Sequence, residues 1–511
     1  MKKLFVTFLT ITLFCTLYAA VNPNPFAYNL SSTYNQVNYD LTINYALNAP
    51  ATNANLVILD GESVAKTIAI PAEKLTKGSH TFTTSMLGID AKSYNWRIDV
   101  YGIERTALQQ CTNSLPPLFQ QFSIDIDNNP TSPYFGRILV TQPVAYDLTN
   151  GVKTYPDAGL YEYTPQLGTP TCHNGGLTYN KTEDYYNYSH YTPHRVRIAQ
   201  DGTGRVFVTS CDLDMSTYLW SVDQETLNTW TPLLTTSQMK TFQGSTGVLH
   251  NSGLDIRGEG DDLTLLLFSG MMGDGAAASA ADKYYACEYQ PYKDASSAAK
   301  ILTVPTASRA TCTQSNAQYD GYGGVWYIHY KKDQASAGLF HKTSDQAWEK
   351  SWPTGTATYL QSKNLASAAF RYNHKNSIVA IAQWANISSF AIYTVKNLSA
   401  TSSPDLSTRT VPATNVADGG SFVEDFAWDY AGNLYVCSRK KVFLYAGISK
   451  ADQAVSTPAT SSFSVIHSDA TFTVTANVKD ADRGGRRFWN IPYWCYCNLD
   501  CNYYKQQGIR V

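Results

Sequence analysis

Six short apolar–polar–apolar segments recur along the chain after residue 120, and each places one central side chain at an equivalent position. These central residues are Asp125, Arg197, Asp255, Gln318, Arg371 and Ala427. If each segment is the innermost strand of one repeat, the central side chains approach a common axis. Charges there could hold a cation or grip a polar substrate. Because the signs alternate, the pattern favours the alternative, a ring of mutually paired Asp and Arg side chains that leaves no charge buried alone.

A second group of candidates lies in one long segment, residues 172–194, which is rich in tyrosine and histidine. The candidate ligand-binding residues are Tyr179, Tyr185, Tyr186, Tyr188, His190, Tyr191 and His194. Aromatic rings stack on the apolar faces of sugars, and the interleaved Asn and acidic side chains can bond sugar hydroxyls. The segment therefore indicates glycan recognition. A loop that only caps one face of the repeat body is the alternative.

Calcium is the one cofactor that the sequence suggests, and the pattern does not demand it. Asp125, Asp127 and Asn129 place oxygen ligands at the first, third and fifth positions of a loop. A calcium loop of the EF-hand type needs glycine at the sixth position and a distant glutamate. Pro130 occupies the sixth position here, so an ordinary turn is favoured over a calcium site.

Cysteines supply the remaining candidates. Cys172 with Cys211 and Cys287 with Cys312 could form disulfides if the chain is exported, since these pairs are near one another in sequence. No GxSxG elbow, HExxH, Walker loop or GxGxxG after a strand is present, so no catalytic residue is assigned.

The elements that would position these residues are β-strands. Each central segment is followed by a second strand, such as residues 137–141, 205–209 and 433–438, and then by further apolar runs. The repeat length is roughly sixty residues, which is long for a four-stranded blade and leaves the excess for loops. Repeats of this kind predict a β-propeller, with six blades or seven. Two stacked β-sandwiches are the alternative.

Residues 25–115 follow a different pattern, in which apolar and polar residues alternate over short runs between turn signals. Examples are residues 39–45, 53–59 and 94–100, with Asp60-Gly61 between two of the runs. This alternation predicts an all-β sandwich. The expected organisation is a leader at 1–20, the sandwich at 21–118, the propeller at 119–450, and a linker with an atypical tail at 451–511.

Two stretches resemble known families. The segment YALNAPATNANLVILDGESV, with the following SYNWRIDVYG, resembles the immunoglobulin-like module of the flagellar-hook-capping type, which implies a spacer or docking role. Residues 201–208 and 429–436 share a D-x-x-G-[NR]-[LV]-[YF]-V turn that is similar to NHL-repeat and gluconolactonase-like propellers. Two aspartates and two arginines at the axis argue against carrying over a gluconolactonase-like cation site. Together with DNNPTSPYFGRILV (127–140), the arrangement resembles uncharacterised secreted Bacteroidota surface proteins.

Composition and the first residues bound the compartment and the partners. Lys2 and Lys3 precede an apolar run from Leu4 to Leu17, which ends at Ala19 and Ala20 as a secretory signal peptide does. The net charge of -2 gives no basic excess for nucleic-acid binding. No later segment is apolar over a membrane-spanning length. The chain is expected to be secreted or at the cell surface, with the periplasm as a further location.

The expected function is a binding or scaffold protein that recognises a glycan or a surface protein through one propeller face. Two alternatives remain open. One is a cation-dependent hydrolase or lactonase of the gluconolactonase-like type, and the other is a purely structural surface component. Catalysis is the less favoured of these, because no catalytic signature is present.

Overall fold

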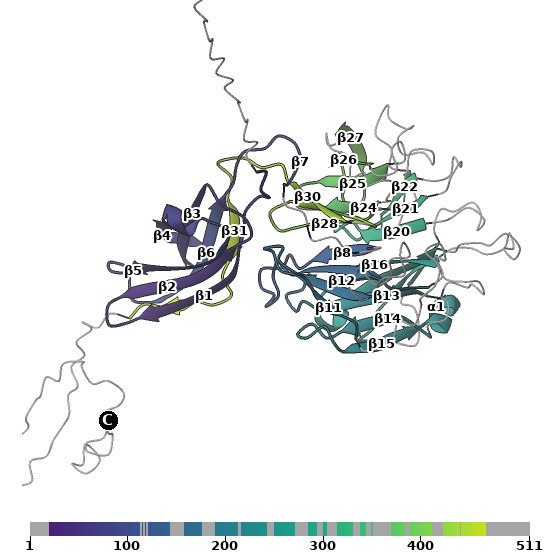
Figure 1. Ribbon diagram of the computed structural model, residues 1–511, viewed down its shortest axis with the longest axis horizontal. Helices are drawn as coiled ribbons and strands as arrows, with labels where there is room; N and C mark the ends of the chain where they lie inside the picture. Colours follow the sequence, from purple (N-terminus) through teal and green to yellow (C-terminus); the bar gives the residue numbers. More distant parts are fainter. Residues whose placement is uncertain are drawn as a thin grey trace, which may run out of the picture.

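The computed structural model describes residues 20–466 apart from 113–114, 116–117, 119–120, 144–157, 176–189, 213–215, 243–249, 271–284, 294–299, 304–313, 331–337, 344–348, 351–368, 384–388, 411–422 and 440. Almost all regular structure in this part of the chain is strand, as Figure 1 shows. None of its helices has both the length and the apolar character needed to cross a membrane. The all-β prediction is confirmed.

The smaller module is a sandwich of two antiparallel sheets. One sheet has the order β1-β2-β5 and contains β1 (Ala27–Asn35), β2 (Asp40–Leu47) and β5 (Gly78–Ser85). The other has the order β31-β6-β3-β4 and contains β3 (Asn53–Asp60), β4 (Ser63–Ala69), β6 (Ser93–Tyr101) and β31 (Val455–Pro458), with β32 (Phe463–Ser464) also on β6. A short 3-10 helix, η1 (Ala72–Lys74), precedes β5.

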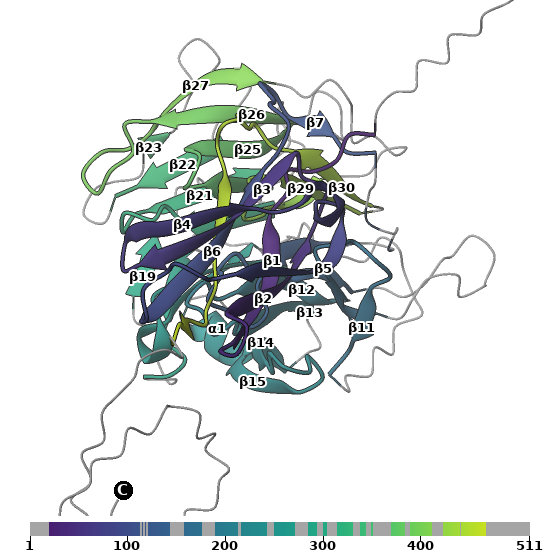
Figure 2. The same ribbon diagram turned by 90° about the vertical axis from the view of Figure 1, so that its left-hand side faces the viewer.

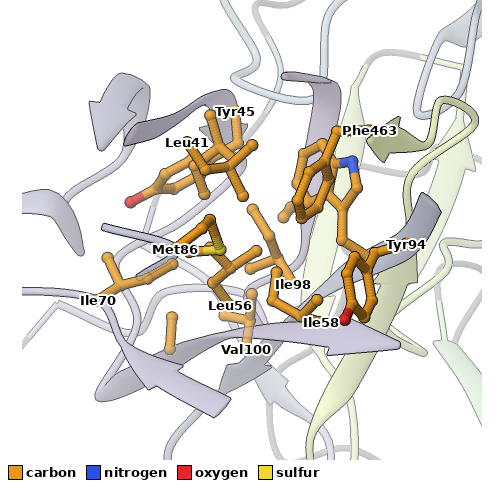
Figure 3. Close-up of a cluster of buried hydrophobic side chains, with 14 of the residues drawn as sticks. Leu41, Tyr45, Leu56, Ile58, Ile70, Met86, Tyr94, Ile98, Val100 and Phe463 are labelled. Carbon is orange, nitrogen blue, oxygen red and sulfur yellow. The ribbon is translucent and has the colours of Figure 1, made fainter. Parts of the chain in front are cut away.

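The alternating pattern of these strands explains the sandwich core. Leu41, Ile43, Leu56, Ile58 and Ile98 all point inward and are fully buried, whereas their polar neighbours face outward. Phe463, from the far end of the chain, stacks on Tyr94 with ring centroids 5.9 Å apart (Figure 3). The core of this module is therefore completed by residues that follow the larger module in sequence.

The larger module contains six four-stranded sheets. The first three are β8 (Ser123–Ile126), β9 (Ile138–Gln142), β10 (Gly159–Tyr163) and β11 (Thr171–His173); β12 (His190–Ile198), β13 (Val206–Asp212), β14 (Thr217–Val222) and β15 (Trp230–Thr235); and β16 (His250–Arg257), β17 (Thr264–Gly270), β18 (Tyr285–Tyr289) and β19 (Lys300–Thr303). The helices α1 (Thr236–Phe242) and η2 (Gly260–Asp262) lie beside the second and third sheets.

The remaining three sheets continue the repeat. They are β20 (Gln314–Tyr319), β21 (Val325–Tyr330), β22 (Gly338–Lys342) and β23 (Glu349–Lys350); β24 (Phe370–Asn373), β25 (Ile378–Gln383), β26 (Ser389–Lys396) and β27 (Asp405–Thr410); and β28 (Val423–Trp428), β29 (Leu434–Ser438), β30 (Val442–Ala446) and β7 (Gln109–Gln110). The first strands β8, β12, β16, β20, β24 and β28 contact one another in turn, and β28 contacts β8 again. The sheets are thus the blades of a closed six-bladed β-propeller.

The ring is closed by a strand from the other end of the propeller sequence. β7 precedes the first blade, yet Gln110 pairs with Tyr445 of β30 and forms the outer strand of the sixth blade. Likewise β31 follows the last blade, yet Val455 pairs with Val100 in the sandwich. β7 lies in the range expected for the sandwich but belongs to the propeller, and β31 lies in the expected linker but belongs to the sandwich. Strands therefore cross both expected boundaries, 118/119 and 450/451.

The two modules pack directly on each other, and Figure 2 views the molecule from the sandwich side. Phe26 of the sandwich lies 5.5 Å from Phe135 and 6.3 Å from Tyr430, measured between ring centroids. The Tyr430 hydroxyl also donates to the backbone oxygen of Ser456 at 2.6 Å. These contacts fix the sandwich against the turns that follow the inner strands of the first and sixth blades.

Candidate functional site

The central side chains of the inner strands meet at the propeller axis. Three of them make the same contact to the next blade, in which a side-chain oxygen accepts from a backbone N–H. Asp125 accepts from Ile198 at 2.8 Å, Asp255 from Tyr319 at 2.7 Å, and Gln318 from Tyr372 at 2.8 Å. In each case the donating residue, Ile198, Tyr319 or Tyr372, directly follows a channel candidate on its own strand. These side chains therefore hold the inner strands of neighbouring blades in register.

The two channel arginines are paired with carboxylates. Arg371 reaches across the axis to Asp255 at 3.3 Å and to Asp125 at 3.4 Å. Arg197 makes two bonds to Asp425, at 2.8 and 3.2 Å. The structure therefore brings all five polar channel candidates together, and it gives each charge an opposite charge.

Asp425 and Arg195 belong to this cluster but were not predicted from the sequence. Ala427, which was predicted to lie at the axis, is not part of the cluster. Ala427 packs among apolar residues between the sixth and first blades and offers no polar group. The charge comes instead from Asp425, two residues earlier. Arg195, two residues before Arg197, lies 3.7 Å from Asp425 and donates to the backbone oxygens of Phe122 and Glu424. The signal was present, since residues two apart on a strand share one face.

Burial and ion pairing shift the pKa values of the channel acids in opposite directions. Burial raises the pKa of Asp125 and of Asp255 above its ordinary value, although Arg371 and Arg197 act against this rise. Burial also opposes ionisation of Asp425, but Arg197 and Arg195 outweigh it and lower the pKa of Asp425 to about 2. Asp425 is thus the firmly ionised member that balances the buried arginines.

A pocket of about 470 Å³ opens at one mouth of this channel. Asp125, Gln318 and Arg371 form its floor at the axis. Its walls are the carboxyl ends of the inner strands and the turns after them, and the wall residues that matter here are Asn128, Gln200, Tyr372, His374, Trp428 and Tyr430. Amides, charges and aromatic rings thus converge on one polar cavity, on the propeller face that carries the sandwich.

The turns that form these walls follow from the sequence. Asp429 accepts from the backbone N–H groups of Ala431 and Asn433 at 3.0 and 2.8 Å, which closes the turn after β28. Gly432 has φ +77°, a conformation that glycine adopts without strain. Asp320 caps the equivalent turn of the fourth blade in the same way, with Tyr322 and Gly324 as donors. The D-x-x-G pattern is therefore a turn signature that shapes the pocket.

Asp429 gives a testable pH dependence. Burial raises its pKa from 3.8 to about 7, so between these values the folded chain holds a proton that the unfolded chain has lost. The stability from this group is present at low pH and is lost as the pH rises through 7. Relative to Asp429→Asn, the free energy of unfolding of the native chain should fall by up to about 1.4 kcal/mol per pH unit between about pH 5 and 7. Urea unfolding at several pH values measures this, and parallel profiles would contradict it.

Most of the tyrosine-rich candidates cannot be placed. Tyr179, Tyr185, Tyr186 and Tyr188 lie outside the described residues, and only the backbone of His190 and Tyr191 is described, on β12. His194 is a correction, because it is only 2% exposed and its ring packs on Phe122 at 5.3 Å. The tyrosine-rich segment enters β12 at its amino end, whereas the pocket lies beyond the carboxyl end of that strand.

Two of the three calcium candidates, Asp127 and Asn129, form a hydrogen-bonded turn. Asp127 accepts from the N–H of Asn129 at 3.1 Å and from the Ser132 hydroxyl at 2.5 Å, and Asn129 accepts from the N–H of Thr131 at 2.9 Å. Asp125 is directed to the channel contacts described above. Their oxygens thus already accept protein donors, and the described residues contain no group of three or more His, Cys, Asp or Glu side chains suited to a metal ion.

The predicted disulfides are not settled by the described residues. Cys287 is buried and its sulfur lies 4.0 Å from the sulfur of Met239, but Cys312 lies outside the described residues, so this pairing stays a prediction. Cys172 Sγ lies 4.0 Å from the backbone oxygen of Ala158. The side chain of Cys211 is not among those described, and its pairing with Cys172 stays a prediction.

Fold and site together define a two-module protein, a β-sandwich joined to a six-bladed β-propeller with a polar pocket at the channel mouth. No protein-family model matches the chain, and no curated protein sequence matches it. Solved structures to which it is similar include a glucose dehydrogenase (10% identity, TM-score 0.41, covering 66% of this chain and 99% of that one). Another is streptogramin B lyase (10% identity, TM-score 0.37, covering 66% of this chain and 96% of that one). A third is a quinonprotein alcohol dehydrogenase-like protein from Bacteroides thetaiotaomicron (10% identity, TM-score 0.30, covering 83% of this chain and 94% of that one). Such low scores say nothing about a shared activity.

Proposed function

We propose that this chain is a secreted or surface-attached binding protein that recognises a glycan at the channel mouth of its propeller. The observation that carries the proposal is the 470 Å³ pocket, which lies within the usual size range for small-molecule sites of about 300–1,000 Å³. Amide groups beside aromatic rings are the groups that bond sugar hydroxyls and pack on sugar rings. The secretory leader expected from the sequence of residues 1–20 is in keeping with this proposal.

The pairing of the channel charges favours binding over catalysis. Arg371 is held by two carboxylates, and Asp125 already accepts from Ile198 and Arg371, so neither group is poised to exchange a proton with a ligand. A rigid, charge-balanced floor instead presents fixed donors and acceptors. The sandwich, which resembles an immunoglobulin-like docking module, then acts as the spacer that carries the propeller.

His374 offers the cleanest test, because it is exposed at the pocket wall and its replacement leaves the core intact. His374→Trp narrows the pocket and should weaken retention on the best ligand of a polysaccharide panel by about tenfold or more. His374→Ala should have a smaller effect. Retention by the full chain and released product are scored in the same samples, with calcium and with chelator.

A double variant, Tyr185→Ala with Tyr186→Ala, tests the alternative that the tyrosine-rich segment binds the ligand. If it abolishes retention while His374→Trp does not, the ligand is bound by the tyrosine-rich segment and not at the channel mouth. If product is released and its release stops when chelator is added, the function is cation-dependent hydrolysis and not binding alone. Equal thermal unfolding midpoints for all variants show that each one is folded.

A further inference from the structure

A second, smaller cavity of about 90 Å³ lies at the junction of the two modules. The residues around it come from the sandwich side, from the turns of the fifth and sixth blades, and from the segment after the last blade. Asn24 and Gly102 belong to the sandwich side, Lys375 and Asn376 to the turn after β24, and Lys450 to the segment after the last blade. About 10–15 Å³ of such space is enough for one water molecule, so this cavity has room for an ion of several non-hydrogen atoms.

The cavity is lined by positive charge without a carboxylate. Lys375 and Lys450 line it, and no Asp or Glu is among its lining residues. Arg105 lies behind Asn24, donates to the Asn24 side-chain oxygen at 2.7 Å, and is only 6% exposed. Arg105 also donates to the backbone oxygens of Ile103 and Asn22, and its Nε is buried with no hydrogen-bond partner among the described residues. Two lysines therefore line the cavity, and the buried guanidinium group of Arg105 lies behind Asn24.

Several other arginines in the described part of the chain are paired with carboxylates. Arg97, Arg137, Arg197, Arg257, Arg371 and Arg439 each lie within 4.0 Å of a carboxylate oxygen. A buried cation without such a partner is costly, so an anion bound near Arg105 would offset the cost of its burial.

The neighbouring acids do not fill this role. Both oxygens of Asp429 accept within their own turn, from Ala431, Asn433 and the Asn433 side chain, and Asp429 lines the channel pocket instead. Glu104 and Asp452 are exposed and do not line the cavity. The ammonium group of Lys375 donates to the backbone oxygen of Tyr430 at 3.1 Å and lies 4.5 Å from the centre of that ring.

We propose that the junction cavity binds a tetrahedral oxyanion, sulfate or phosphate, through Lys375, Lys450 and the side-chain amide of Asn376. The oxyanion is either a free ion or the ester group of a sugar. Its oxygens accept charge-assisted hydrogen bonds from the two ammonium groups, which are stronger than neutral ones. Because the sandwich and two blades all line the cavity, the bound ion ties the modules together.

Titration calorimetry of the full chain with sodium sulfate and with sodium phosphate tests the proposal, against sodium chloride at equal ionic strength. We expect saturable binding of the oxyanions only. Lys450→Gln and Lys375→Gln should each weaken it by about tenfold. Lys396→Gln, at an exposed lysine on β26, is the matched control and should leave it unchanged.

Absence of saturable heat, or equal binding by native chain and Lys450→Gln, would overturn the proposal. A second arm compares N-acetylglucosamine 6-sulfate with the unsulfated sugar. Tighter binding of the sulfated sugar than of free sulfate identifies an ester as the ligand, and the reverse order identifies the free ion. Lys375 lines both cavities, whereas Lys450 lines the junction cavity and not the channel pocket, so the Lys450→Gln result and the His374 result can fail independently.

Discussion

Asp425→Ala should destabilise the propeller by about 3–5 kcal/mol, because it leaves two buried arginines without their counter-charge. Asp425 is fully buried and pairs with Arg197 and Arg195. It also accepts from the Ser123 hydroxyl at 2.6 Å and the Ile124 N–H at 3.3 Å, so its loss also frees donors at the seam between the last and first blades. Urea unfolding followed by tryptophan fluorescence measures the change.

An exposed ion pair provides the control for this prediction. Asp60 pairs with Lys92, and both side chains are about half exposed. Solvent screens surface pairs of this kind, so Asp60→Ala should be almost neutral. Equal effects of Asp425→Ala and Asp60→Ala would show that the channel cluster does not stabilise the ring.

Asn433→Ala should have the second-largest effect, and it acts at the junction of the modules. The Asn433 side-chain oxygen accepts from the N–H groups of Asn24 at 2.7 Å and Gly447 at 3.2 Å, and its amide donates to Asn24 and Asp429. Alanine leaves two buried N–H groups unpaired, at about 1–3 kcal/mol each. The total should be about 2–5 kcal/mol.

The measurement for Asn433→Ala is calorimetric unfolding of the full chain. Since Asn24 leads directly into the sandwich, we expect the unfolding temperature to fall and the transitions of the two modules to separate. Asn44→Ala is the matched control, because this asparagine is exposed on β2 and bonds only to Ser31 and Thr81. Similar losses in both variants would contradict the role of the Asn24–Asn433 contact.

The predictable parts of the fold are those that depend on neighbours in sequence. Alternating runs such as Leu41 to Tyr45 and turns such as Asp429 to Gly432 specify strands and hairpins locally, and both are found as expected. β7 and β31 were not predicted, because each pairs with a strand hundreds of residues away or across a module boundary. Two to four residues of a strand carry too little pattern to reveal such a partner.

The same distinction applies to the site. Asp125, Arg197, Asp255, Gln318 and Arg371 were found because one alignment of the repeats places them at equivalent positions. Asp425 was missed because the sixth blade carries its charge two residues earlier, next to an irregularity in the pairing of β28 with β29. Periodicity shows which residues of a strand face the channel. It does not show which of them must carry a charge, because that depends on the side chains that other blades contribute, such as Arg197 beside Asp425.

The crossed ends of the chain have a consequence for how the protein is made. β7 pairs with β30, and the sandwich core includes Phe463. A nascent chain that emerges from its amino end therefore completes the propeller only when Ala446 is available and the sandwich only when Phe463 is available. Until then both modules expose unpaired strand edges and apolar surface, which makes partial chains prone to aggregation. Folding of this chain is therefore expected to depend on a holding chaperone more than folding of a chain whose modules close one after the other.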